Sequence, residues 1–324
     1  MMQTSLKMNS KGVVNFLKKY NTYLILVMLL MVCMSISPDF FTATNAVNIG
    51  RQYSGLTIVS LGMLFVILTG GIDLSVGSFV ALGSVTMALS LRSGIGMLLS
   101  IIITLIIGFA GGIFSGVLVS KVKLPPFIIT MAMMTMARGA AFMISDGSPV
   151  KAPGNSIQGL GKGTVFGSVP ILVILAAIFV IAFFFIINYT SFGRIIVAIG
   201  SNEKAVHLSG IRVDLYKMAV YSISGVCSVI GGIIAASRTG IGTPLYGSGM
   251  ELDAIAACVI GGASLSGGQG SAVKTVVGVL VLALIGNIMN LLSVPSYPQD
   301  IIKGLIIIVS TLIQIFTSSK KSTV

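Results

Sequence analysis

The sequence predicts an all-α integral membrane protein that crosses the bilayer about ten times as a single membrane domain. Three observations support this prediction: 55% of the residues are hydrophobic, only 9% are charged, and the apolar residues gather in long runs between short polar segments. A soluble domain carries about a quarter charged residues, so these runs must face lipid. The backbone of a segment in lipid must satisfy its own hydrogen bonds, which favours helices. The composition excludes a soluble enzyme.

The predicted spans follow one another between an N-terminal tail, residues 1–19, and a C-terminal tail, residues 318–324. A span with its loop takes roughly 30 residues, so a chain of 324 residues has room for about ten. The spans are residues 20–38, 54–70, 76–91, 95–120, 125–145, 169–187, 215–236, 252–264, 272–292 and 299–317. The eighth is too short for a ~30 Å hydrocarbon core, which predicts a broken or re-entrant helix.

The distribution of positive charge predicts the orientation. Ten crossings place thirteen of the twenty lysines and arginines in cytoplasmic segments and five on the opposite side. The positive-inside rule then predicts that both termini are cytoplasmic, with the longest cytoplasmic loop at about 188–214. The basic residues stand singly or in pairs, without the dense stripe that binds nucleic acid.

An internal repeat links the two halves of the chain. Residues 70–77 and 261–268 share the pattern G-G-x-[D/S]-L-S-x-G and lie between predicted helices of the same direction, so the halves are predicted to be related in parallel. One interpretation is two helix corners with capping side chains. The other is a pair of discontinuous helices near a translocation path. The candidate path or gate residues here are Gly70, Gly71, Asp73 and Ser75.

The second copy of the repeat contains the pentapeptide LSGGQ, residues 265–269, which is typical of ATPase domains. The sequence has no G-x-x-x-x-G-K-[S/T] loop to hold phosphates, so we expect a membrane corner and no nucleotide bound by this chain. One histidine and no nucleophile-and-base set predict neither a metal site nor catalysis. The acidic residues fall in loops or near span ends, which disfavours an ion relay. Asp73 keeps an ion-gradient-driven secondary transporter of a small polar solute open as the alternative.

The loop 188–214 is predicted to contain a short helix. Ser201 or Asn202 can cap its start, Glu203 favours its first turn, and Gly210 can end it. The helix either docks a partner protein or is an ordinary connector. Further polar residues near or within spans either line the path or form interhelical hydrogen bonds: Asn48, Gln52, Asn287 and Asn290. Glycines at 108, 112 and 116 predict a close helix contact, and Cys33, Cys227 and Cys258 are predicted to pack in apolar surroundings.

Several stretches together resemble the membrane permease subunits of bacterial ABC importers for ribose and related monosaccharides. They are residues 68–78, 146–150, 192–210, 251–262 and 297–304, and the likeness extends in order from about residue 45 to 317. The resemblance implies a permease homodimer, or sometimes a heterodimer, in the inner membrane. It also implies cytoplasmic ATPase subunits that use ATP, and an extracytoplasmic sugar-binding protein. The sugar would cross by alternating access.

The resemblance assigns coupling to the ATPase to six residues: Asn202, Glu203, Lys204, Ala205, Ser209 and Gly210. The family motif resembles E-A-A followed by glycine. The sequence departs from it, because Glu203-Lys204-Ala205 stands one residue farther from its glycine, so the register of the docking contacts is not carried over.

Overall fold

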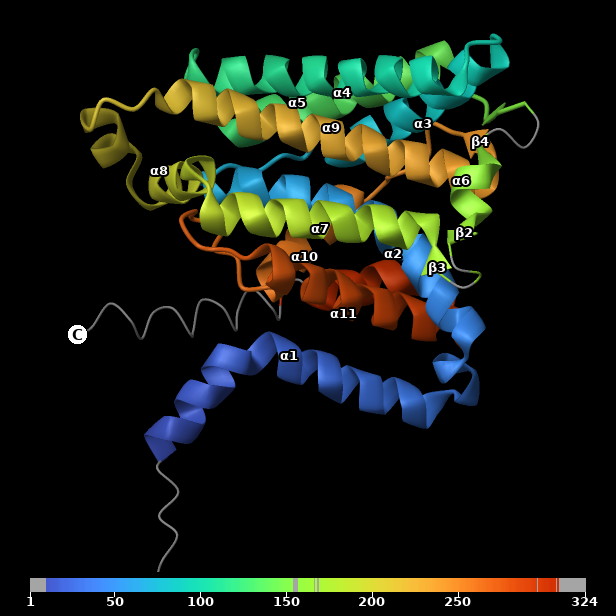
Figure 1. The fold of residues 1–324 in the computed structure, drawn as a ribbon, viewed down its shortest axis with the longest axis horizontal. Helices are drawn as coiled ribbons and strands as arrows, with labels where there is room; N and C mark the ends of the chain where they lie inside the picture. Colours follow the sequence, from blue (N-terminus) through green and yellow to red (C-terminus); the bar gives the residue numbers. More distant parts are fainter. Residues whose placement is uncertain are drawn as a thin grey trace, which may run out of the picture.

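A computed structural model describes residues 10–306 and 308, apart from residues 154–156, 166, 168 and 296, and it describes side chains from Thr22 onward. The described part is a bundle of roughly parallel and antiparallel helices (Figure 1). In chain order, the helices are α1 (Ser10–Ile36), η1 (Pro38–Phe41), α2 (Ala43–Leu68), α3 (Val76–Arg92), α4 (Met97–Ser120), α5 (Pro126–Ile144), α6 (Gln158–Lys162), α7 (Ile171–Tyr189), α8 (Ser191–Leu208), α9 (Val213–Thr239), α10 (Met250–Ile260) and α11 (Ala272–Leu291). Residues 297–306 are also helical.

Helix α2 forms the centre of the bundle. Every residue from Ser54 to Leu68 is buried, since α7, α8, α9, α10 and α11 all contact this helix or its ends. The outer helices α4, α5 and α7 instead expose apolar side chains such as Phe109, Met136 and Ile181. This arrangement is typical of a bundle that faces lipid, with its small and polar groups turned inward.

The glycine series of α4 packs directly on α9, as the sequence predicted. A Cβ at Gly112 would lie 2.7 Å from Ser222 Cα, and one at Gly116 would lie 2.7 Å from Met218 Cα. Only glycine lets the two backbones approach this closely. The three cysteines are buried, as predicted from their apolar surroundings.

The predicted spans correspond to helices in nine cases, and most of the tenth, residues 299–317, lies outside the described residues. Six described helices are long and apolar enough to cross a membrane, whereas α3 is shorter, with 17 residues, and α10 has only 11. The prediction of a short eighth helix is therefore confirmed. Two boundaries were wrong: α1 begins at Ser10 instead of residue 20, and α2 begins eleven residues earlier than residue 54, because Thr42 caps it by accepting a hydrogen bond from the Asn45 amide.

The two ends of the bundle differ in structure. One end, the α8 end, holds α8 and the segments that join α2 to α3, α4 to α5 and α10 to α11 (Figure 1). The other, the hairpin end, holds α6 and four short strands: β1 (Val150–Lys151), β2 (Thr164–Val165), β3 (Val169–Pro170) and β4 (Ile241–Gly242). Strand β1 pairs antiparallel with β4, and β2 pairs antiparallel with β3.

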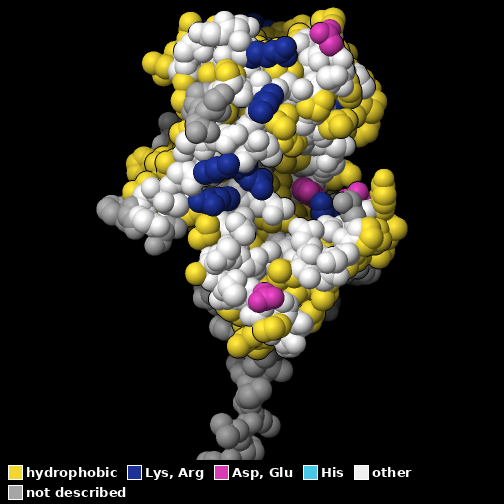
Figure 2. Space-filling model, turned by 90° about the vertical axis from the view of Figure 1, so that its right-hand side faces the viewer, with side chains coloured by type: hydrophobic (Ala, Val, Ile, Leu, Met, Phe, Trp, Pro, Cys, Tyr) yellow, Lys and Arg dark blue, Asp and Glu magenta, His cyan; other side chains and the backbone are white. Residues whose placement is uncertain are grey.

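The hairpin end also carries a group of basic side chains, near the middle of the face drawn in Figure 2. The residues on the elements of this end include Arg51, Lys151, Lys162 and Arg238, and the Arg51 guanidinium donates a hydrogen bond to the Lys162 carbonyl over 2.8 Å.

Candidate coupling and transport sites

The predicted loop 188–214 is almost entirely helical, which corrects its assignment as a loop containing only one short helix. Helix α8 begins at Ser191 because the Thr190 side chain accepts a hydrogen bond from the Gly193 amide. The helix then breaks at Asn202, whose backbone is extended (φ −158°, ψ 91°). The Asn202 side chain caps the second part by accepting a hydrogen bond from the Ala205 amide over 3.0 Å. Of the two predicted caps, the structure selects Asn202, since the Ser201 hydroxyl donates to the Val197 carbonyl.

The second part of α8, residues 203–208, projects from the bundle. Lys204, Ala205 and His207 are exposed, and Val206 is the one buried residue of this turn-and-a-half. The part ends at Ser209 and Gly210, where Gly210 has φ +82° and open space around its Cα, a conformation that suits glycine at a helix end. A short, exposed and capped helix held on a fixed stem can fit a groove of another protein.

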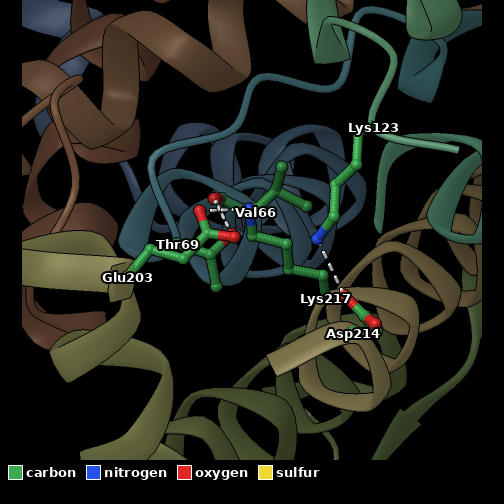
Figure 3. A network of polar contacts seen from close by, with 6 residues as sticks. All are labelled: Val66, Thr69, Lys123, Glu203, Asp214 and Lys217. Atoms are coloured by element: carbon green, nitrogen blue, oxygen red, sulfur yellow. Dashed lines mark hydrogen bonds and ion pairs between the residues drawn. The ribbon is translucent and has the colours of Figure 1, made fainter. Parts of the chain in front are cut away.

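Two ion pairs link the start of α9 to its surroundings, one to this helix and one to the α4–α5 connection (Figure 3). Lys217 Nζ lies 2.6 Å from Glu203 Oε2, and the Lys217 side chain is only 15% exposed. Lys123, in the α4–α5 connection, lies 3.1 Å from Asp214 Oδ1. The pair of Glu203 is partly buried, and it joins the first residue of the projecting helix to α9.

The two copies of the sequence repeat meet at the base of this helix. The Gly268 amide donates a hydrogen bond to the Leu68 carbonyl over 3.0 Å, which joins the second corner to the end of α2. A Cβ on Gly267 would lie 2.8 Å from both Gly200 Cα and Gly70 N. We call this contact, formed by Gly200, Gly267 and Gly268 with Leu68 and Gly70, the glycine junction. It brings α8 and both corners into backbone contact, and LSGGQ lies in a membrane corner as predicted.

Asp73 lies in the connection between α2 and α3, as its position between two predicted spans suggested, and it is buried inside the bundle. Residues 69–75 form the non-helical connection from α2 to α3, and Asp73 within it is only 2% exposed. Its carboxylate accepts hydrogen bonds from the Ser75 amide and hydroxyl on one oxygen and from the Ser224 hydroxyl, 2.7 Å away, on the other. Asp73 therefore ties the first corner to α9. Of the capping side chains considered for this corner, Ser75 does not cap α3, because its hydroxyl donates to Asp73.

The remaining predicted path residues do not form one site. The Asn287 and Asn45 side-chain amides exchange two hydrogen bonds of 2.9 and 2.7 Å between α11 and α2, which is the interhelical alternative considered for Asn287. Asn290 is exposed and accepts a hydrogen bond from Gln299. Asn48 and Gln52 are exposed near the hairpin end of α2. Gly71 and Ser75 are buried with Asp73, and Gly70 belongs to the glycine junction.

A polar cluster around the short helix α10 was missed as a candidate site. The Arg138 guanidinium, on α5, donates hydrogen bonds to the carbonyls of Pro244 and Tyr246, in the segment that leads into α10. Glu251, in the first turn of α10, is electrostatically coupled to Arg138, and its Oε2 atom is buried without a hydrogen-bond partner.

The same helix carries a second charged contact two residues on. Asp253 pairs with Lys303 over 3.3 Å. Charged residues inside predicted spans mark functional positions in membrane proteins. The sequence places Arg138 within the fifth predicted span and Lys303 within the tenth. These two charged positions are the sequence feature that could have revealed the cluster.

Comparison with known proteins shows the relationship of the chain. The family described as "Branched-chain amino acid transport system / permease component" matches residues 45–311. The ribose import permease protein RbsC of Haemophilus influenzae is 39% identical over 310 residues, 94% of this chain and 96% of that protein. RbsC of Bacillus subtilis is 40% identical over 92% of each chain. The L-arabinose transport system permease protein AraH of Escherichia coli is 35% identical over 94% of this chain and 93% of that protein. No solved structure matches.

These relationships agree with the apolar helical bundle and confirm the resemblance seen in the sequence. The protein is an integral inner-membrane component of a transport system that works with an ATPase and a binding protein, and it is not an enzyme. The chain belongs to the permease family of ABC import systems.

Proposed function

We propose that this chain is the permease subunit of an importer that carries a ribose-type monosaccharide into the cytoplasm. The observation that carries the proposal is the similarity to ribose import permeases over more than nine tenths of the chain. Permeases named for L-arabinose and D-allose are also similar, at 35% identity each, which supports a monosaccharide as the substrate class. ATP is bound and hydrolysed by separate subunits.

The α8 end faces the cytoplasm in this proposal. The positive-inside rule supports this orientation, because the connections at this end carry unpaired basic residues such as Lys121, Arg194 and Arg212. The capped helix 203–208 then projects toward the ATPase, and Asn202, Glu203, Lys204, Ala205, Ser209 and Gly210 form its docking surface. ATP-driven movement of this helix reaches both corners through the glycine junction, and the bundle alternates between outward and inward openings.

The translocation path lies between two copies of the chain, along the face formed by α5 and α10. Arg138 and Glu251 support this location, because charged groups beside an exposed apolar helix need water or a partner instead of lipid. The α5 face next to them exposes Phe127, Met131 and Met136 and includes Gly139, which has open space around it. This face suits packing against the same helix of a second copy, so we propose a homodimer with a polar path at its centre.

Reconstitution tests the proposal. The chain, its ATPase and a ribose-binding protein are placed in proteoliposomes, and ribose uptake is measured with and without ATP. We expect ATP-dependent uptake that competes with unlabelled ribose. Glu203→Ala and Gly210→Pro are expected to insert normally but to reduce uptake. Since proline requires φ near −65°, Gly210→Pro cannot adopt the native backbone at φ +82°.

Two results would contradict the proposal. Normal uptake by both variants would show that helix 203–208 is not the coupling element. Uptake by the chain alone, driven by an ion gradient without ATP, would instead support the secondary transporter.

A further inference from the structure

An apolar groove on the outer surface of the bundle lies between α4, α7 and α9, at the α8 end. It has a volume of about 420 Å³, within the range of roughly 300–1,000 Å³ that is usual for small-molecule sites. Helix α9 lies between α4 and α7 in Figure 1 and lines the groove along its length. The groove is lined by Phe109 and Ile113 of α4, Phe179 and Phe183 of α7, and the face of α9 from Leu215 to Cys227.

The lining suits a hydrocarbon chain and not a sugar. Its hydroxyl group belongs to Ser222, which already donates a hydrogen bond to the Met218 carbonyl of its own helix over 2.8 Å. A sugar in this groove would therefore lose hydrogen bonds to water without replacement. The flanking helices α4 and α7 bury few of their residues and expose apolar side chains, for example Phe114 and Phe185, which places the groove on a lipid-facing surface.

The length of the groove matches one leaflet of the bilayer. Its α9 face runs from Leu215 to Cys227, which corresponds to about 18 Å of helix. Half of a ~30 Å hydrocarbon core is about 15 Å. The groove starts at the first turn of α9, at the α8 end, so it extends from one membrane surface to the middle of the bilayer.

Two cations lie at the surface end of the groove. Arg212 is the residue before α9, three positions before Leu215 of the groove. Lys121 is the residue after α4, eight positions after Ile113 of the groove, and a spacing of eight keeps two residues on the same face of a helix. Both side chains are exposed, and the ion pairs found in the described chain do not include them. The neighbouring Lys123 and Lys217 are neutralised by Asp214 and Glu203. The long side chains of Arg212 and Lys121 can reach the headgroup region.

We propose that the groove holds one acyl chain of an anionic phospholipid from the leaflet at the α8 end, and that Lys121 and Arg212 bind its phosphate. The groove supplies the hydrophobic contact, and the two cations select the headgroup. The site depends only on the membrane location of the bundle, so it stands whether or not the proposed substrate is correct.

Native mass spectrometry of the full-length purified chain tests the site, with added palmitoyl-oleoyl phosphatidylglycerol or phosphatidylcholine as the probe. A cation near the membrane surface favours an anionic lipid by about fivefold, so two cations predict about 25-fold tighter binding of the first phosphatidylglycerol. Replacement of both cations, Lys121→Gln with Arg212→Gln, is expected to abolish this preference. The matched control Arg92→Gln removes an exposed cation at the hairpin end and is expected to keep it.

A second pair of variants tests the apolar part. Ala219→Phe fills the groove and is expected to weaken the first bound lipid of either kind at least tenfold, whereas Leu98→Phe enlarges an exposed side chain outside the groove and leaves binding unchanged. Equal affinity for both lipids in the unmodified chain would overturn the proposal, as would unchanged binding to Ala219→Phe. Disulfide formation between two copies carrying Ala219→Cys would assign the groove to a protein interface and also overturn it.

Discussion

The glycine junction gives the sharpest test of how α8 is connected to the bundle, through the substitution Gly200→Ala. A Cβ at this position would overlap the Leu68 carbonyl oxygen and lie 2.9 Å from Gly267 Cα. Ordinary contact begins at 3.4 Å, and the atoms met are backbone atoms, which cannot rotate away. The methyl group must therefore push α8 from the second corner by at least half an ångström.

The expected magnitude follows from the cost of overpacking. Extra methyl groups in a well-packed site cost about 1–3 kcal/mol, which corresponds to a change of roughly 5- to 150-fold in the population of the intact junction. Because helix 203–208 lies beyond the substitution, its docking surface is unchanged. We expect Gly200→Ala to assemble with the ATPase and to hydrolyse ATP at a rate close to normal, while sugar uptake falls by at least fivefold.

The assay measures ATP hydrolysis and ribose uptake in the same proteoliposomes, and the ratio of sugar to ATP is the reported quantity. Gly159→Ala is the matched control, since this helical glycine of α6 has open space around it and lies at the hairpin end, away from the glycine junction. A ratio equal to that of the unmodified protein would refute the role of the junction. Loss of assembly together with uptake would also refute it, because the defect would then lie in docking.

Three further predictions concern other parts of the site. Asn202→Ala removes the cap of helix 203–208, which costs about 1 kcal/mol, so uptake is expected to fall severalfold. Asn202→Asp keeps a capping oxygen and is expected to restore uptake, and failure of this rescue would show that loss of the cap is not the cause. Asp73→Asn keeps an acceptor for Ser75, so uptake is expected within about threefold of normal; loss of uptake with an unchanged melting temperature would show that transport needs the carboxylate charge. Gly112→Ala overpacks the contact of α4 with α9 and lowers the free energy of unfolding by about 1–3 kcal/mol in thermal unfolding, whereas Gly159→Ala in α6 does not lower it.

The local features of helix 203–208 were accessible from the sequence because they depend on neighbouring residues. The cap at Asn202 and the helix end at Gly210 need only the spacing of a polar side chain, a short helix and a glycine. The longer stem from Ser191 was not predicted, since its start depends on the cap formed by Thr190 after a continuous apolar helix.

The role of a buried polar residue was less accessible. Asp73 stands in a polar corner of the sequence, and its pattern fits a cap, a gate or an ion site equally well. Only the packing of α9 brings Ser224, 151 residues away, against its carboxylate. The same holds for Asn287, whose partner Asn45 lies 242 residues away.

The sequence by itself determined that this protein is a membrane-embedded helical bundle, roughly where its long apolar helices lie, and which family it resembles. These properties follow from composition, from local spacing and from the hydrogen-bonding demands of a backbone in lipid. Only the tertiary structure shows that the two repeated corners meet at α8 and that Asp73 is buried against α9. It alone also shows that Arg138 and Glu251 lie in one site. Such contacts join residues distant in the chain, and they depend on which helix faces pack together, a choice that no local pattern specifies.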